Sequence, residues 1–303
     1  MANLTLKQLR YFDALARAGH FGRAAEVVAI SQPALSMQIK ELEEGLGNPL
    51  FDRGARAVRL TAFGEEFLTR AREVLRLTEE LEDLGRVSKG HLAGRLRMGV
   101  IPTVAPYLLP QVIAELTRAY PGLDLQLRET ITPKLLAELA EGRLDCAIVA
   151  LPVSEPSLTE VALFAEDFVL VRPLRDAGLP VPNADMLREM RLLLLEEGHC
   201  FRDQALSFCK RQSLQPRELL DGSSLTTLVQ MVGAGIGVTL IPEMAVAVET
   251  RSAHVSIARF NGAQPSRRIG MVWRRTSPLS KQLLQVADVV RAAGLAQRAG
   301  LHP

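Results

Sequence analysis

The 303-residue sequence has only three cysteines, no long uninterrupted apolar run and a net charge of +2 at pH 7. The cysteines lack metal-ligand spacing, which argues against a disulfide framework and against a zinc site. The first ten residues, MANLTLKQLR, have no apolar signal core. The apolar stretch at 233–248 is interrupted by Pro242 and Glu243, which speaks against a membrane span. We expect a cytoplasmic protein with no membrane association and no cofactor.

The composition is that of a globular protein. Hydrophobic residues make up 48% of the chain and the mean hydropathy is +0.11, enough for two or three domains with substantial cores. Because the net charge is too small to indicate nucleic acid, any DNA binding must come from local charge.

Residues 1–60 have the pattern of a helix-turn-helix. Apolar residues at helical spacing predict a first helix that Gly19 ends, followed by a short second helix over 21–28. Ser31 is the expected N-cap of a third helix, with Pro33 in its first turn. The buried stripe of that helix is Leu35, Ile39, Leu42 and Leu46.

Another face of the third helix carries Gln32, Ser36 and Lys40, with Pro33 and Met37 beside it. Amide, hydroxyl and ammonium groups suit base edges and phosphates in a major groove, although a solvated helix face would look similar. The next segment separates the two interpretations. Arg53, Arg56 and Arg59 recur around Gly54 in an expected hairpin, typical of a wing that grips the phosphate backbone.

A long helix is predicted from Thr61 to about Leu84. Its apolar residues follow steps of seven, three and four, which indicates a seam for pairing two chains. These residues are Phe67, Val74, Leu77, Leu81 and Leu84. The alternative is a single helix packed on its own domain. Glycine and serine at 85–94 then indicate a hinge.

The remaining chain alternates short strand patterns with helices, which predicts a doubly wound α/β unit. Ligands bind beyond the carboxyl ends of the strands in such sheets. Thr103 follows the first strand, Thr132 is placed to cap the helix after the second, and Cys200 follows the apolar run 192–195. These three polar groups are expected to converge near one cleft.

Cys200 and Cys209 lie nine residues apart in GHCFRDQALSFC, and Cys200 is expected at a helix start. Nine helical steps place two side chains on opposite faces, roughly 13.5 Å apart along the axis, whereas a disulfide needs Cα atoms within about 7 Å. If the segment is helical when reduced, joining the two cysteines must unwind it. The alternative is that both thiols are buried and inert. Charged residues of both signs lie near Cys200 in the sequence, and the sequence does not show which of them point toward its thiol.

The segment ARAGHFGRAAEVVAISQPALSMQIKELEEGLGNPLFDR, followed by LTAFG, resembles the N-terminal domain of LysR-type transcriptional regulators, and the likeness extends over essentially the whole chain. The resemblance implies an α/β protein with a winged helix-turn-helix at 1–60, a dimerisation linker helix and hinge at 61–90, and a two-lobed, periplasmic-binding-protein-like effector domain at 91–303. Lobe I would comprise 91–165 and 267–303, and lobe II 166–266. The implied DNA-binding residues are Gln32, Pro33, Ser36, Met37, Lys40, Arg53 and Thr61. Many members of the family have a basic residue where Met37 stands, which weakens the case for base readout there.

Four further segments, IPTVAPYLLP, LDC, GHCFRDQALSFC and RRIGMVWR with a following SPL, resemble the peroxide-sensing branch of the family. The resemblance implies that Cys200 is the peroxidatic thiol and Cys209 resolves it to an intramolecular disulfide. The implied peroxide pocket comprises Thr103, Thr132, His199, Asp203 and Arg268. Simple helix capping is the plain alternative for the two threonines, and a loop position for the histidine. Cys146 is expected to be an inert core residue.

The expected partners are promoter half-sites in double-stranded DNA, a second copy of the chain in a homodimer that pairs into a dimer of dimers, RNA polymerase, and hydrogen peroxide as the signal. Two other interpretations of the function stay open. One is a LysR regulator that responds to a metabolite and carries these cysteines incidentally. The other is a thiol peroxidase fused to a DNA-binding domain, although no CxxC motif accompanies the α/β pattern. We expect a sensor that is not an enzyme.

Overall fold

The computed structural model describes residues 4–52, 58–87, 92–208, 221–261 and 264–301. The chain divides into two compact units, Met1–Gly85 and Arg86–Pro303. Three of the predicted features lie outside the described residues: the wing residues Arg53, Gly54 and Arg56, the hinge residues Ser88 and Gly90, and Cys209.

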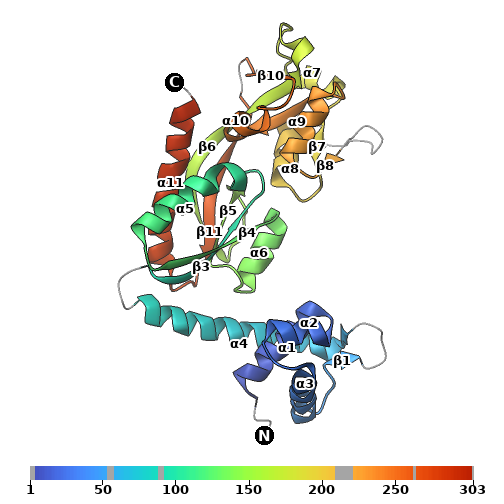
Figure 1. Ribbon diagram of the computed structural model, residues 1–303, viewed down its shortest axis with the longest axis vertical. Coiled ribbons are helices and arrows are strands. Elements are labelled where there is room, and N and C mark those ends of the chain that lie inside the picture. Colours follow the sequence, from blue (N-terminus) through green and yellow to red (C-terminus); the bar gives the residue numbers. More distant parts are fainter. Residues whose placement is uncertain (1–3, 53–57, 88–91, 209–220, 262–263, 302–303) are drawn as a thin grey trace. The chain divides into compact units, whose positions relative to one another are not determined.

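The first unit consists of three short helices, a two-stranded hairpin and one long helix (Figure 1). The elements are α1 (Leu6–Ala18), α2 (Phe21–Val27), α3 (Gln32–Leu46), β1 (Phe51–Asp52), β2 (Arg59–Leu60) and α4 (Ala62–Val87). The predicted ends are confirmed. Gly19 ends α1 at a φ of 60°, and the Ser31 side chain accepts a hydrogen bond from the Ala34 amide at the start of α3.

Two buried carboxylates connect the elements of this unit. Glu43 on α3 accepts hydrogen bonds from the amides of Leu50 and Phe51, at 2.8 and 3.1 Å, and so fixes the start of the hairpin. Asp13 on α1 accepts from Arg72 Nε at 2.9 Å, which holds α4 against α1. Asp13 is paired with an arginine and Glu43 with backbone amides, so both buried carboxylates have hydrogen-bond partners. The hydrophobic pattern alone did not reveal them.

The second unit is built on a mixed sheet of seven strands (Figure 1). The strands are β3 (Gly94–Val100), β4 (Leu123–Glu129), β5 (Cys146–Leu151), β6 (Leu158–Pro173), β9 (Thr239–Pro242), β10 (Val255–Ala258) and β11 (Ser266–Arg274). Their order is β10-β6-β11-β5-β3-β4, with β9 also paired to β6. Helices α5 (Ala105–Ala119) and α11 (Ser280–Leu301) lie on one side of the larger part of this sheet, and α6 (Thr132–Ala140) lies on the other side. The predicted α/β class is confirmed.

The long strand β6 changes partner partway along its length. Its first part, through Asp167, pairs with β11, and from Phe168 onward it pairs with β9. The second unit therefore forms two lobes. The strands β6 and β11 run from the first lobe to the boundary between the lobes. We use the name crossover for residues 166–168 and 265–267.

The second lobe carries the cysteine segment. Its remaining elements are the short helix η1 (Leu174–Asp176), α7 (Ala184–Glu189), β7 (Leu194–Leu195), α8 (Cys200–Phe208), β8 (Asp221–Gly222), α9 (Leu225–Gly233), η2 (Glu243–Ala245) and α10 (Val246–Glu249). Of the apolar run at 192–195, only Leu194 and Leu195 form a strand, and Leu192 makes an isolated bridge with Val238. The expectation that a helix starts at Cys200 is confirmed. Within the described residues, no helix is long and apolar enough to cross a membrane.

Candidate functional site

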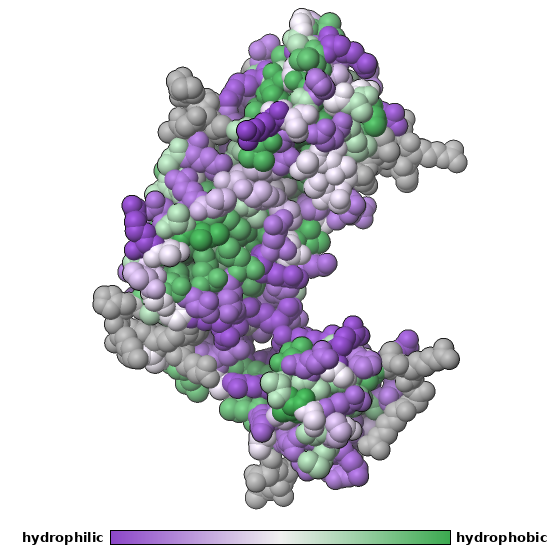
Figure 2. Space-filling model, viewed as in Figure 1, coloured by the Kyte–Doolittle hydropathy of each residue, from purple (hydrophilic) through white to green (hydrophobic). Residues whose placement is uncertain are grey.

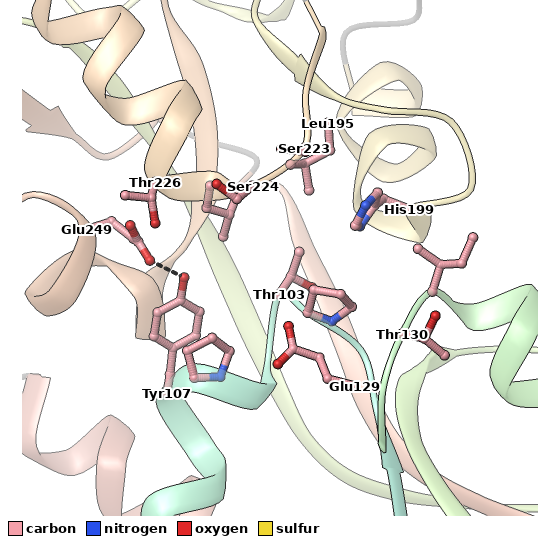
Figure 3. Close-up of a pocket in the computed structure, with 14 residues that line it drawn as sticks. Thr103, Tyr107, Glu129, Thr130, Leu195, His199, Ser223, Ser224, Thr226 and Glu249 are labelled. Atoms are coloured by element: carbon pink, nitrogen blue, oxygen red, sulfur yellow. Dashed lines mark hydrogen bonds between the residues drawn. The ribbon is translucent and has the colours of Figure 1, made fainter. Parts of the chain in front are cut away.

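A cavity of about 280 Å³ lies between the two lobes of the second unit, and Figure 3 shows the side chains around it. The first lobe contributes Pro102, Thr103, Pro106, Tyr107, Glu129, Thr130 and Ile131; the second contributes Leu195, His199, Ser223, Ser224, Leu225, Thr226 and Glu249. Two of the predicted pocket residues, Thr103 and His199, therefore line one cavity. The other predicted residues do not line it.

Thr103 is held by an arginine that the sequence analysis did not choose. Arg267 is buried, and its Nη1 donates to Thr103 Oγ1 at 2.7 Å while its Nη2 donates to the Thr103 carbonyl at 3.0 Å. The predicted Arg268 is exposed, so its assignment to the pocket was wrong by one residue. Successive side chains of a strand point to opposite faces, and the inward position on β11 belongs to Arg267.

Arg267 also forms a buried ion pair. It lies directly opposite Glu166 on β6, and the distance from its Nη2 to Glu166 Oε2 is 2.8 Å, with both side chains almost fully buried. The other oxygen of Glu166 accepts a hydrogen bond from the Met244 amide at 3.1 Å. The guanidinium lies 5.4 Å from the ring centre of Phe201. The pair thus combines an apolar surrounding with hydrogen bonds, as a desolvated ion pair requires.

Cys200 is half-buried and is the first residue of α8. A turn carries the chain into it, and Gly198 in that turn has a φ of +92°. This backbone conformation favours glycine, and a Cβ at Gly198 would in addition meet the end of the Ile131 side chain, with Cδ1 at 2.8 Å. Arg202 Nη1 donates to the Leu195 carbonyl at 2.8 Å, which ties the first turn of α8 to β7. Cys200 does not line the cavity, but it directly follows His199, which does.

His199 and Asp203 have different environments on this segment. The His199 ring reaches the cavity wall (Figure 3), and burial lowers the pKa of His199, partly opposed by the Glu196 carboxylate. Asp203 is exposed on α8 and does not line the cavity, so its predicted place in the pocket is not observed. The reason is helical geometry, since α8 buries Phe201 and Arg202 and turns Asp203 to solvent.

Thr132 does not cap α6. The N-cap is Ile131, without a side-chain hydrogen bond, and Thr132 is the first helical residue. Its Oγ1 is buried and has no hydrogen-bond partner within the described part of the chain. A buried hydroxyl without a partner costs about 1–3 kcal/mol, so a ligand that supplied one would be stabilised here. Thr103 is not a cap either, because Val104 precedes α5.

The far end of the cavity contains a pair that the sequence analysis missed. The Tyr107 hydroxyl on α5 donates to Glu249 Oε1 on α10 at 2.6 Å, and both residues are buried. Burial, reinforced by the Glu249 carboxylate, raises the pKa of Tyr107 well above its ordinary value, so the phenol keeps its proton. Neither residue carries a local signal, because the two lie 142 positions apart.

The charged side chains that line the cavity are acidic. Its lining includes the carboxylates of Glu129 and Glu249, with hydroxyl groups around them, and among the described residues that line it none is lysine or arginine. The chemistry therefore suits a neutral hydrogen-bonding molecule better than an anion. Across the described ranges, no cluster of three or more histidine, cysteine, aspartate or glutamate residues is placed to hold a metal ion.

Cys146 is fully buried in β5, and burial raises the pKa of its thiol. This agrees with its expected place in the core. The two described cysteines therefore differ in accessibility, and Cys200 is the accessible one.

The exposed face of α3 carries the predicted DNA-binding side chains: Gln32, Pro33, Ser36, Met37 and Lys40 are all exposed. Thr61 differs from them. Its hydroxyl donates to the Pro49 carbonyl at 2.8 Å and accepts from the Gly64 amide at 2.9 Å. These bonds place the hydroxyl at the start of α4, and the DNA contact of Thr61 stays a prediction.

The family models match both units: residues 6–65 match the bacterial regulatory helix-turn-helix protein of the LysR family, and residues 89–294 match the LysR substrate binding domain. The chain belongs to the LysR family of transcriptional regulators.

Within that family the chain is similar to OxyR proteins. It is 43% identical over 296 residues to a probable hydrogen peroxide-inducible genes activator of Streptomyces viridosporus, covering 95% of this chain and 94% of the relative. It is 40% identical to the DNA-binding transcriptional dual regulator OxyR of Escherichia coli K12, covering 95% of each.

Two solved structures have the same architecture. A full-length OxyR mutant from Pseudomonas aeruginosa superposes with a TM-score of 0.75 and 36% identity, covering 95% of this chain and 98% of that chain. A hydrogen-peroxide-bound OxyR mutant from Corynebacterium glutamicum superposes with a TM-score of 0.68 and 37% identity, covering 98% and 94%.

Proposed function

We propose that this chain is a peroxide-responsive LysR-type regulator that binds DNA, with Cys200 as the peroxidatic thiol. The observation that supports it most is the position of Cys200, half-buried at the first residue of α8 and directly after the cavity-lining His199. A thiol must be accessible to react with peroxide, and of the two described cysteines Cys200 is the accessible one. The chain's likeness to OxyR proteins, one of them bound to hydrogen peroxide, supports the same signal.

The proposed chemistry balances with one peroxide per thiol pair. The Cys200 sulfur attacks one peroxide oxygen, the O–O bond breaks, and sulfenic acid and water form. The Cys209 sulfur then attacks the sulfenic sulfur, water leaves, and a disulfide remains. The proposed hydrogen-bonding groups for peroxide are the Thr103 hydroxyl and the Thr132 hydroxyl, which has no partner within the described part of the chain. His199 lines the same cavity as Thr103. Arg267 replaces Arg268 in this set, acting through Thr103.

The cavity chemistry argues against the alternative of an anionic metabolite. An anion would face Glu129 and Glu249 without a lysine or arginine among the described residues of the lining. Hydrogen peroxide is neutral and both donates and accepts hydrogen bonds. Its binding therefore needs no cation.

The proposed switch follows from the geometry of α8. The segment is helical from Cys200 to Phe208. A disulfide between Cys200 and Cys209 needs their Cα atoms within about 7 Å of each other, whereas a helix continuing to Cys209 would hold them roughly 13.5 Å apart along its axis. Oxidation therefore requires at least part of α8 to unwind. We propose that this refolding alters contacts between effector domains and so the spacing of two DNA-binding units.

The proposed assembly is a homodimer that pairs into a dimer of dimers. On α4, the residues Val74, Leu77, Leu81 and Leu84 are between 42 and 68% exposed, an apolar stripe typical of a seam between two helices. On the effector domain, apolar side chains gather over α5, where Ile113 is exposed (Figure 2). RNA polymerase is the proposed partner of the oxidised form, which would activate transcription of peroxide-defence genes. Because one peroxide is consumed per pair, the protein acts as a sensor rather than an enzyme.

Peptide-mapping mass spectrometry tests this proposal. The reduced full-length protein is treated with about one equivalent of hydrogen peroxide per chain, beside Cys200→Ser and Cys146→Ser variants. The expected product is a Cys200–Cys209 disulfide in the wild type and in Cys146→Ser, but not in Cys200→Ser. Unmodified thiols in the wild type would overturn the proposal, and repeated peroxide turnover with added thiol reductant would overturn the non-enzymatic part.

A further inference from the structure

Arg267 occupies a point where several parts of the effector domain meet. Its guanidinium bonds to Thr103 after β3 and to Glu166 on β6, and Glu166 in turn accepts from Met244 in η2. Arg267 and Glu166 both belong to the crossover, where β6 leaves β11 and enters the second lobe. The strength of this buried ion pair therefore bears on how firmly the two lobes are held together.

The ion pair is covered by a residue of the cysteine segment. Phe201 directly follows Cys200, is 2% exposed, and places its ring centre 5.4 Å from the Arg267 guanidinium. Phe201 also packs edge-on against Phe168 in the crossover, with 4.7 Å between ring centres. Phe168 lies 6.0 Å from the same guanidinium. Two aromatic rings thus form an apolar cover for the cation, and α8 supplies one of them.

We propose that Phe201 is the positioning residue that transmits the state of Cys200 to the crossover. It neither touches peroxide nor reacts. While α8 is folded, the ring keeps water from Arg267 and adds a cation–π contact, so the Arg267–Glu166 pair acts in a low dielectric. When the first turn of α8 unwinds, Phe201 leaves with its neighbour Cys200, water reaches the guanidinium, and the pair and its bonds to Thr103 weaken. The inference rests on the proposed disulfide switch.

α8 also contains a matched control for this inference. Phe208, at the other end of the helix, packs edge-on against Phe260 with 5.1 Å between ring centres. Like Phe201, it lies on α8 and packs against another aromatic ring. That ring, Phe260, lies outside the crossover. Phe201→Leu and Phe208→Leu therefore each remove one aromatic pair from α8, and only the first uncovers Arg267.

Hydrogen–deuterium exchange of the full-length protein is the test, with peptides covering 158–173 and 266–274 followed in the reduced form and after about one equivalent of peroxide. In the wild type, oxidation is expected to raise exchange at the crossover several-fold. In reduced Phe201→Leu the crossover should already exchange at the raised rate, and oxidation should add little. Phe208→Leu should behave as the wild type does.

The outcomes separate this inference from the proposed function. A disulfide that forms in the wild type without any rise in crossover exchange overturns the coupling and leaves the switch intact. The absence of a disulfide in the wild type overturns both. The wild-type comparison needs no variant, so the inference remains testable if Phe201→Leu does not fold. If both variants raise crossover exchange equally when reduced, the role of Phe201 is merely structural and the coupling is wrong.

Discussion

The hydroxyl of Tyr107 and the carboxylate of Glu249 form a 2.6 Å hydrogen bond that joins the two lobes across the cavity. Tyr107 belongs to α5 in the first lobe and Glu249 to α10 in the second. Figure 3 shows this bond as a dashed line at the cavity wall, away from Thr103.

Removing the phenol should destabilise the reduced protein. Tyr107→Phe leaves the buried Glu249 carboxylate without its donor, which is expected to cost about 1–3 kcal/mol. Urea unfolding of the reduced protein would measure this. Tyr120→Phe, at the half-buried tyrosine that ends α5, is the control and should cost less. Equal midpoints for the two variants would show that the bond contributes nothing.

The two neighbouring arginines of β11 should differ sharply. Arg267→Ala leaves Glu166 buried and unpaired, with an expected loss of about 3–5 kcal/mol, whereas Arg268→Ala is a surface change within about 0.5 kcal/mol. Thermal unfolding of both variants tests this. If Arg268→Ala were the more damaging change, the inward position on β11 would have to be reassigned.

The two described cysteines should react at different rates. Burial leaves Cys146 inaccessible and raises the pKa of its thiol, while Cys200 is partly exposed. In reduced native protein, iodoacetamide should modify Cys200 well before Cys146, and the difference should disappear in denaturant. Mass spectrometry of a time course gives the rates. Comparable native rates would show that the core around β5 opens readily.

Stability should fall as the pH falls through the range where histidine titrates. Burial lowers the pKa of His199 in the folded protein, so the unfolded chain binds the proton first, at its ordinary value of about 6.5. The contribution of neutral His199 is therefore lost below about that pH. His199→Gln should show a shallower loss of unfolding midpoint between about pH 7.5 and 5.5 than the wild type.

The apolar stripe of α4 should govern self-association. Leu81 is 68% exposed, and Leu81→Asp would place a charge in the proposed seam between two copies. Analytical ultracentrifugation should show a shift toward monomer without a large change in unfolding of the single chain. Val27→Asp, at a 75% exposed residue of α2, is the control. A dimer that survives Leu81→Asp would place the interface elsewhere.

Local patterns were sufficient for the features that depend on one segment. The stop at Gly19, the cap at Ser31 and the start of α8 at Cys200 follow from side-chain chemistry within a few residues, and all three are observed. The exposed face of α3 follows from helical periodicity in the same way. The sequence by itself therefore determined the helix-turn-helix, the α/β class and the helix that begins at Cys200.

Only the tertiary structure decided features that depend on register and on distant contacts. From Ile269 through Arg274 every residue of β11 is buried, so alternation along the strand cannot tell whether Arg267 or Arg268 faces inward. Pairing with Glu166 settles it. Threonine is a common N-cap residue, so Thr132 was predicted to cap α6. The path of the chain into the helix instead places Ile131 at the N-cap position. The inter-lobe bond of Tyr107 to Glu249 joins segments 142 residues apart, and packing rather than any local preference brings them together.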